Sequence, residues 1–245
     1  MEKDRVRKAI QELKQFYKGL SFEPLIWQRD GNKRDAYRTL IVMGLSQQTS
    51  DKKGLPVWGT FLSLYPTAND LIKAWNLSRD KVLSIVEPLG LHGRSHQILE
   101  AAVDFGIAIP SEAADLQRPG RGIGETTAEK IVGYGYGKPA LPLDSHGCRV
   151  VSRICNLSPS QHHRCLRKQL KHIFRRRSDW IEVHELLRLH GQVVCKKSQP
   201  ACGNCPLSVC ASRGDFDQDK HAISPRKAAK EVVALWDKWR QLLIS

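Results

Sequence analysis

Residues 121–150 read RGIGETTAEKIVGYGYGKPALPLDSHGCRV, and they hold two features from which the fold can be argued. The first is Gly122-Ile123-Gly124, which lies between two segments of helical pattern. Glycines permit a tight turn and a close approach of the backbone. The amides of residues 123–125 would then face outward at a helix N-terminus, where a DNA phosphate can bind. A plain helix–helix turn would use the same glycines, so the hairpin alone does not assign a function.

The second feature is Asp144, which stands twenty residues after Gly124. It follows an apolar strip and precedes a helical pattern that begins at His146. Aspartate in this place usually caps the N-terminus of a helix. It can also serve as a half-buried carboxylate at the mouth of a pocket, and the two roles are compatible.

Downstream, CKKSQPACGNCPLSVC carries four cysteines with six, two and four residues between them, Cys195, Cys202, Cys205 and Cys210. Four thiolates so close in sequence can hold one metal centre, either a [4Fe–4S] cluster or a Zn²⁺ ion. Disulfides are disfavoured, because the N-terminal MEKDRVRKAIQELKQF lacks the apolar region of a signal peptide. We therefore expect an intracellular protein of the cytoplasm or nucleoid, not a secreted one.

The composition favours a folded protein with a polyanionic partner. Hydrophobic residues make up 41% of the 245 residues, so a core can form. No apolar run is as long as a membrane span, and we expect no membrane association. Lys and Arg number 39 against 25 Asp and Glu, a net charge of +14. The stretch 162–177 holds seven Lys or Arg and no acid, which indicates salt-sensitive binding to nucleic acid.

Apolar residues recur every three or four positions along most of the chain, which predicts amphipathic helices. The last of them begins at Ser224-Pro225, an N-cap followed by proline at the first helical position. Its apolar stripe includes Trp236 and Trp239 and should dock on the body of the protein. Residues 213–223 form a polar connector. We find no strand pair and no internal repeat in the sequence, so the predicted fold class is all-α.

The hairpin, Asp144 and the four-cysteine loop stand in an order and at distances that resemble the helix-hairpin-helix (HhH-GPD) DNA glycosylase superfamily. Its endonuclease III, MutY-type and mismatch-specific thymine glycosylase branches are the most similar. Four further motifs agree with the family pattern: Trp27-Gln28, Leu45-Ser46-Gln47-Gln48-Thr49, Leu89-Gly90-Leu91-His92 and Leu189-His190-Gly191. The similarity runs from about Phe16 to Cys210.

The resemblance implies two helical domains that flank a DNA-binding cleft. A six-helix barrel with the hairpin would span 35–143, and a discontinuous iron–sulfur cluster domain would combine 1–34 with 144–214. Residues 215–245 would form a connector and a C-terminal amphipathic helix. The expected partner is duplex DNA with a damaged or mismatched base, from which the target nucleotide is flipped into a pocket. We expect a monomer, because DNA supplies the partner surface.

The same resemblance implies roles for single residues. Asp144 matches the catalytic aspartate, which stabilises positive charge on the sugar as the N-glycosidic bond breaks and can help to activate water. Gln48 matches the residue that fills the vacated space in the base stack. Contacts to the DNA backbone are expected from Gly122, Gly124, Lys130, Lys196 and Lys197, and pocket specificity from Met43, Gln47, His92 and Thr126. The four cysteines would hold a [4Fe–4S] cluster, with zinc as the alternative.

The chain departs from the family pattern at several positions. Thr126 stands where bifunctional enzymes carry the lysine that attacks the sugar and forms a Schiff base. Threonine cannot form an imine, so we expect a monofunctional glycosylase that uses water, with Lys130 as a fallback nucleophile. Met43 stands where adenine glycosylases carry a glutamate, which disfavours adenine excision. Three further cysteines have no partner in this scheme and are predicted as core thiols: Cys148, Cys155 and Cys165.

These features together predict a base-excision-repair DNA glycosylase that hydrolyses the N-glycosidic bond of uracil or thymine opposite guanine. Three alternatives stay open. They are a bifunctional glycosylase and lyase that acts on oxidised pyrimidines, an alkylated-purine glycosylase, and a lesion-binding protein without catalysis. The last cysteine spacing is one residue shorter than the common family pattern, which also keeps a zinc-containing nucleic-acid adaptor as a weaker alternative.

Overall fold

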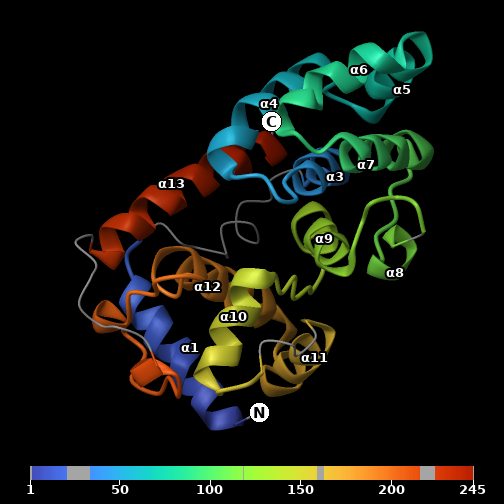
Figure 1. Cartoon of the computed structure of the whole chain (residues 1–245). Coiled ribbons are helices and arrows are strands. Elements are labelled where there is room, and N and C mark those ends of the chain that lie inside the picture. Colours follow the sequence, from blue (N-terminus) through green and yellow to red (C-terminus); the bar gives the residue numbers. More distant parts are fainter. Residues whose placement is uncertain (1, 21–33, 118, 159–162, 216–223, 245) are drawn as a thin grey trace. The chain divides into compact units, whose positions relative to one another are not determined.

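The structure is a computed structural model, and it describes residues 2–20, 34–117, 119–158, 163–215 and 224–244. Every regular element in this part of the chain is helical, so the predicted all-α fold class is confirmed (Figure 1). None of the described helices is long and apolar enough to cross a membrane. The Trp27-Gln28 motif lies outside the described residues.

The chain folds into two compact units. The cysteine unit combines Met1–Ile26 with Leu143–Ala234, and the hairpin unit combines Trp27–Pro142 with Leu235–Ser245. Helix α13 (Pro225–Ile244) contributes its first part to the cysteine unit and its last part to the hairpin unit. The domain boundaries that the family resemblance implies, at 34/35, 143/144 and 214/215, stay a proposal.

Helix α3 (Ala36–Leu45) is the centre of the hairpin unit. Asp35 caps it by accepting a hydrogen bond from the backbone N–H of Arg38 at 3.0 Å. All residues from 39 to 45 are buried, as expected for the nearly uninterrupted apolar sequence LIVMGL. The helices packed around α3 are α4 (Asp51–Leu64), α7 (His92–Phe105) and α9 (Glu125–Lys130).

The other helices of the hairpin unit are shorter. They are α5 (Ala68–Leu77), α6 (Arg79–Val86) and α8 (Ala113–Leu116). Helix α9 continues as a wider π-helical turn over Ile131–Gly135, so the helical path changes its winding after Lys130. Gly135 lets this turn approach α3, because a Cβ there would lie 3.1 Å from Cα of Ala36.

The last part of α13 is anchored in the hairpin unit by its tryptophans. Trp236 and Trp239 are 0% and 1% exposed. The ring of Trp239 meets the ring of Tyr134 edge-on, with centroids 5.7 Å apart. Arg38 donates a hydrogen bond to the carbonyl of Leu242 at 3.0 Å. The predicted docking of the tryptophan stripe is therefore confirmed.

The cysteine unit is built around α10 (Ser145–Ile154). It packs against α1 (Lys3–Tyr17), α11 (His163–Ile173) and α12 (Trp180–Val193), and its approach to α12 is the closest (Figure 1). A Cβ at Gly191 would lie 2.9 Å from the backbone oxygen of His146. A Cβ at Gly147 would lie 2.7 Å from Cδ1 of Leu143. Gly191 is what allows α10 and α12 to lie so close, whereas Gly147 makes room for Leu143, which precedes α10.

Replacing Gly191 by alanine tests this packing. We expect Gly191→Ala to lower the free energy of unfolding by about 1–3 kcal/mol, because the new methyl group meets backbone atoms that cannot rotate away. Urea unfolding followed by circular dichroism measures the change. The matched control is Gly59→Ala in α4, where the nearest atom to the new Cβ is 3.9 Å away. Equal midpoints for the two variants would show that the close approach is unimportant.

Candidate active site

Asp144 is the N-cap of α10 in the cysteine unit, as predicted. Its Oδ1 accepts hydrogen bonds from the backbone N–H groups of His146 and Gly147, both at 3.0 Å. Its Oδ2 lies 3.7 Å from Nε of Arg188 on α12, and the Asp144 side chain is 14% exposed. The carboxylate is thus held in one orientation by the backbone on one side and a buried cation on the other.

The groups around Asp144 are largely desolvated. Burial lowers the pKa of His146, and the Asp144 charge opposes that shift. Nδ1 of His146 lies 3.1 Å from Nη2 of Arg149. Burial raises the pKa of the Cys148 thiol to about 12, so Cys148 is a core thiol as predicted. The same prediction is wrong for Cys165, which is exposed on α11, and Cys155 is only half-buried.

The glycine hairpin belongs to the hairpin unit. Gly120 and Gly122 have φ values of +83° and +65°, a region that favours glycine. A Cβ at Gly122 would also lie 3.1 Å from Cδ of Arg94. Ile123, between Gly122 and Gly124, is buried and anchors the turn. Gly124 is exposed and is the N-cap of α9.

Gln47 ties the hairpin to the rest of this unit. Its Nε2 donates to the carbonyl of Gly122 at 3.1 Å, and its Oε1 accepts from Arg94 at 2.8 Å. Arg94 lies on α7 and reaches the same Gly122 carbonyl at 3.4 Å. One side chain therefore links the end of α3, the start of α7 and the hairpin. A mutation of Gln47 would disturb the hairpin as well as any pocket.

Gln48 adopts a left-handed backbone conformation that residues other than glycine rarely take. Its φ is +57°, and its side chain is exposed next to the half-buried Gln47. Left-handed backbone costs a non-glycine residue about 1–2 kcal/mol, and such strain gathers at functional sites. This conformation is an independent reason to regard Gln48 as a functional residue.

The other residues proposed for the pocket lie on three helices of the hairpin unit. Met43 is buried in the last turn of α3, and Thr126 is half-buried in the first turn of α9. His92 begins α7, is exposed, and lines a concave surface with Glu87 and His96. Lys130 is half-buried one turn beyond Thr126. Gln47 adds a direct hydrogen bond to the hairpin.

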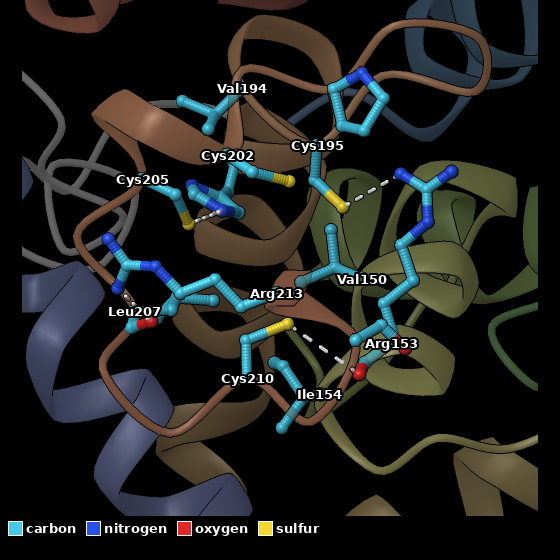
Figure 2. A pocket seen from close by; sticks show the side chains of 13 residues that line it. Val150, Arg153, Ile154, Val194, Cys195, Cys202, Cys205, Leu207, Cys210 and Arg213 are labelled. Carbon is cyan, nitrogen blue, oxygen red and sulfur yellow. Dashed lines mark hydrogen bonds between the residues drawn. The ribbon is translucent and has the colours of Figure 1, made fainter. Parts of the chain in front are cut away.

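The four cysteines surround one hollow in the cysteine unit (Figure 2). Its apolar walls include Val150 and Ile154 of α10 and Val194. All four thiols are half-buried. Burial raises the pKa of Cys202, Cys205 and Cys210, to about 12 for Cys205, and the neighbouring thiolate charges raise it further. The sequence prediction that these cysteines gather around one centre is consistent with this arrangement.

Two arginines of α10, which the sequence reasoning did not single out, hold the start of the cysteine loop. Arg149 donates to the carbonyls of Cys195 and Gly191 at 2.8 and 2.7 Å. Arg153 donates to the carbonyls of Lys196 and Lys197 at 2.7 and 3.0 Å, and its Nη1 lies 3.3 Å from Sγ of Cys195. The exposed side chains of the two lysines are thereby set on a fixed backbone.

A second contact to the thiols comes from His190, at the end of α12. Its Nε2 lies 3.5 Å from Sγ of Cys205, and its Nδ1 lies 3.1 Å from the hydroxyl of Tyr17. Burial lowers the pKa of His190 to about 3, so the ring is neutral. Tyr17 and Cys205 thus stand at opposite nitrogens of the neutral His190 ring, one of which carries the proton and the other of which can accept.

A known protein family matches this chain. The family described as "HhH-GPD superfamily base excision DNA repair protein" matches residues 41–176, more than half of the chain. The chain belongs to this superfamily. The matched stretch of this HhH-GPD protein includes Gln48, the hairpin and Asp144, and it ends before the four cysteines.

Similar proteins place it in the endonuclease III-like branch. Endonuclease III of Bacillus subtilis (strain 168) is 28% identical over 206 residues, which cover 78% of this chain and 86% of that protein. A solved non-covalent endonuclease III–DNA complex has a TM-score of 0.75 at 22% identity, covering 88% of this chain and 98% of its own. A thermostable thymine-DNA glycosylase has a TM-score of 0.70 at 19% identity, covering 86% and 98%. The two structures show the shared fold.

The strained backbone of this HhH-GPD protein at Gln48 leads to a prediction with two readouts. Gln48→Gly should be about 1 kcal/mol more stable than Gln48→Ala, because glycine alone removes the cost of the left-handed conformation. Both variants should lose at least about ten-fold in base excision, since both lack the side chain that the family uses to fill the stack. Thermal or urea unfolding and a single-turnover assay measure the two quantities. Equal stability of the two variants would contradict the strain.

Proposed function

We propose that this chain, a DNA glycosylase of base excision repair, is monofunctional and hydrolyses the N-glycosidic bond of uracil or thymine opposite guanine. The observation that carries the proposal is the geometry of Asp144. Its carboxylate is mostly buried, capped by two backbone N–H groups and faced by Arg188. A purely DNA-binding module has no use for a carboxylate fixed in this way beside a polyanion.

The chemistry follows from the charge that develops as the bond breaks. The departing base takes the bonding electrons, and the sugar gains oxocarbenium character. A fixed carboxylate in a site of low polarity stabilises that positive charge without having to reorganise. The two N–H groups engage Oδ1 of Asp144 and leave Oδ2 as the oxygen that can face the sugar or accept a proton from water. Arg188 limits how far Oδ2 can rotate.

Thr126 decides between water and the protein as nucleophile. It stands in the first turn of α9, at the position that matches the lysine of bifunctional relatives. A threonine hydroxyl cannot form the Schiff base on which strand cleavage depends. Water therefore attacks the sugar, and an abasic site is the product. Lys130 on the same helix is the residue that would support the alternative, a bifunctional enzyme for oxidised pyrimidines.

The substrate assignment rests on what stands in the proposed pocket. Met43 is apolar and buried where adenine glycosylases carry a glutamate, so a group that could protonate adenine is missing at that position. Together with Thr126, this is the pattern of the mismatch-type branch. Gln48, Gly122, Gly124, Lys130, Lys196 and Lys197 would contact DNA, and the protein would act as an intracellular monomer.

The cysteines would hold a [4Fe–4S] cluster. Endonuclease III relatives usually carry one, and Cys195, Cys202, Cys205 and Cys210 surround a hollow in this chain. No group of three or more His, Cys, Asp or Glu side chains in the described part of the chain stands together as a metal site, so the spacing of the four cysteines and the family carry this proposal. When bound, the cluster would cross-link the loop that carries Lys196 and Lys197.

An excision panel with Asp144→Asn tests the proposed chemistry. Asparagine can still accept the two cap hydrogen bonds, so the fold and DNA affinity should persist while the single-turnover rate falls about 100-fold or more. Duplexes with uracil, mismatched thymine, adenine opposite 8-oxoguanine, thymine glycol, hypoxanthine or an alkylated purine are each divided into alkali-treated and untreated samples. We expect wild-type cuts only after alkali.

The control for this panel is Asp179→Asn. Asp179 stands at the N-cap position of α12, but its side chain makes no capping hydrogen bond. The control variant should keep the wild-type rate. Cuts without alkali, or an adduct trapped by borohydride, would show that a lysine is the nucleophile and would overturn the monofunctional assignment. Full activity of Asp144→Asn would remove Asp144 from the catalytic role.

Metal analysis tests the cofactor. We expect about four iron atoms per chain and a brown colour in anaerobically purified protein, and loss of both in Cys202→Ser. Cys165→Ser is the matched control, because Cys165 is exposed on α11 and should leave the iron content unchanged. One zinc and no iron in the wild type would refute the cluster. In either case the alkali assay reports on Asp144 independently.

A further inference from the structure

We propose that the exposed face of α11 and the three arginines after it form a second DNA-contacting surface, which binds phosphates of the duplex on either side of the lesion. We call this surface, Arg164, Lys168, Lys171, Arg175, Arg176 and Arg177, the basic stripe. The inference rests on the proposed function in one respect, that the partner is duplex DNA. It is separate from the hairpin and the cysteine loop, and it adds affinity without reading the base.

The spacing puts the cations of α11 on one side of the helix. Leu166, Leu170 and Ile173 are buried and fix the inner face of α11. Arg164, Lys168 and Lys171 follow one another at intervals of four and three residues, which is the repeat of one helix face, and they extend about 10 Å along it. The three consecutive arginines follow directly after the helix ends, and like Lys168 they are exposed.

The stretch of sequence that carries the stripe holds no acidic residue, since no Asp or Glu occurs from residue 163 to residue 178. A further cation comes close from α1, where Nζ of Lys3 lies 3.4 Å from Nε2 of His172.

Such an arrangement has a cost that a polyanion removes. Like charges three or four residues apart destabilise a helix. The stripe places two such pairs in a row on α11, Arg164 with Lys168 and Lys168 with Lys171. A DNA duplex carries one negative charge per about 1.7 Å, so it matches a continuous row of cations better than a single bound anion would.

The stripe is also fixed relative to Asp144. Arg167, on the buried side of α11, donates to the carbonyl of Leu143 at 3.3 Å, and Leu143 directly precedes the catalytic candidate. Nζ of Lys171 lies 4.9 Å from the ring centroid of Trp180, which begins α12. Phosphates bound along the stripe would therefore lie at a set distance from Asp144 within the same unit.

The salt dependence of binding to undamaged duplex DNA tests the proposal. The stripe variant combines Lys168→Gln, Arg175→Gln and Arg176→Gln, and the control variant combines Lys227→Gln, Lys230→Gln and Lys238→Gln, three exposed lysines of α13. If the three stripe residues contact phosphates, the slope of log Kobs against log salt should fall in magnitude by about 2.7. The control should change it much less. Single-turnover excision at saturating enzyme should keep the wild-type rate in both variants.

The possible outcomes distinguish a DNA-binding stripe from a solvated surface and from an RNA-binding surface. Equal slopes for the stripe variant and the wild type, or equal losses in the two variants, would mean that the stripe is a solvated surface and would overturn the proposal. Unchanged binding of duplex DNA with weaker binding of single-stranded RNA would assign the stripe to RNA instead. A reduced slope in a protein that excises no base would uphold the stripe and refute the glycosylase. Circular dichroism confirms that both variants are folded.

Discussion

The close approach of α10 to α12 is the constraint on which the rest of the cysteine unit depends. Glycine at 191 removes the side chain that would keep the two helices apart. Arg188 on α12 is thereby brought to 3.7 Å from Asp144 at the start of α10. The end of α12 also carries His190, whose Nε2 lies 3.5 Å from Sγ of Cys205. The candidate catalytic carboxylate and the cysteine loop are thus supported by one pair of helices.

Helix α10 also joins these two regions along its length. Asp144 caps its N-terminus, and Arg149 and Arg153, one turn apart near its other end, hold the loop that begins at Cys195. Ten helical residues span about 15 Å, and a packed helix does not change that length. Loosening of the cysteine loop would free the two arginines and would reach Asp144 through a helix that has lost one of its anchors. A metal centre bound by the proposed cysteine ligands would in this way support Asp144 without contacting the substrate.

The sequence could predict the parts of this protein that are encoded locally. Helical periodicity, the glycine turn, the cap at Asp144 and the clustered cysteines are short-range patterns, and each of them is present in the structure. Arg153, Arg188 and Tyr17 could not be found in that way, because each acts on a residue more than 40 positions distant in sequence. A basic pair four residues apart at 149 and 153 was visible, but nothing local distinguished it from a solvated face.

Gln47 and Gln48 also show that local sequence does not reveal which contacts a residue makes in the folded unit. Gln47 and Gln48 are identical in type and adjacent in sequence, so only the family resemblance separated their roles. The positive φ of Gln48 turns its side chain to solvent, while Gln47 bonds inward to Gly122 and Arg94. That division depends on where α3 ends relative to the hairpin, which is a property of the packed unit. The positions of the proposed pocket residues Met43 and Thr126 depend on the same packing.

The surroundings of the four cysteines affect how easily their thiols lose a proton. Burial and mutual repulsion raise the pKa of Cys202, Cys205 and Cys210, so the protein itself favours neutral thiols at physiological pH. A metal centre must displace those protons, which makes its binding pH-dependent and couples it to the folding of the loop. The charge of Arg153 opposes this rise of the pKa at Cys202 and Cys210, and Nε2 of His190 lies 3.5 Å from Sγ of Cys205. Arg153 belongs to α10 and His190 to α12, so the pair of helices that fixes Asp144 also places these polar groups beside the cysteines.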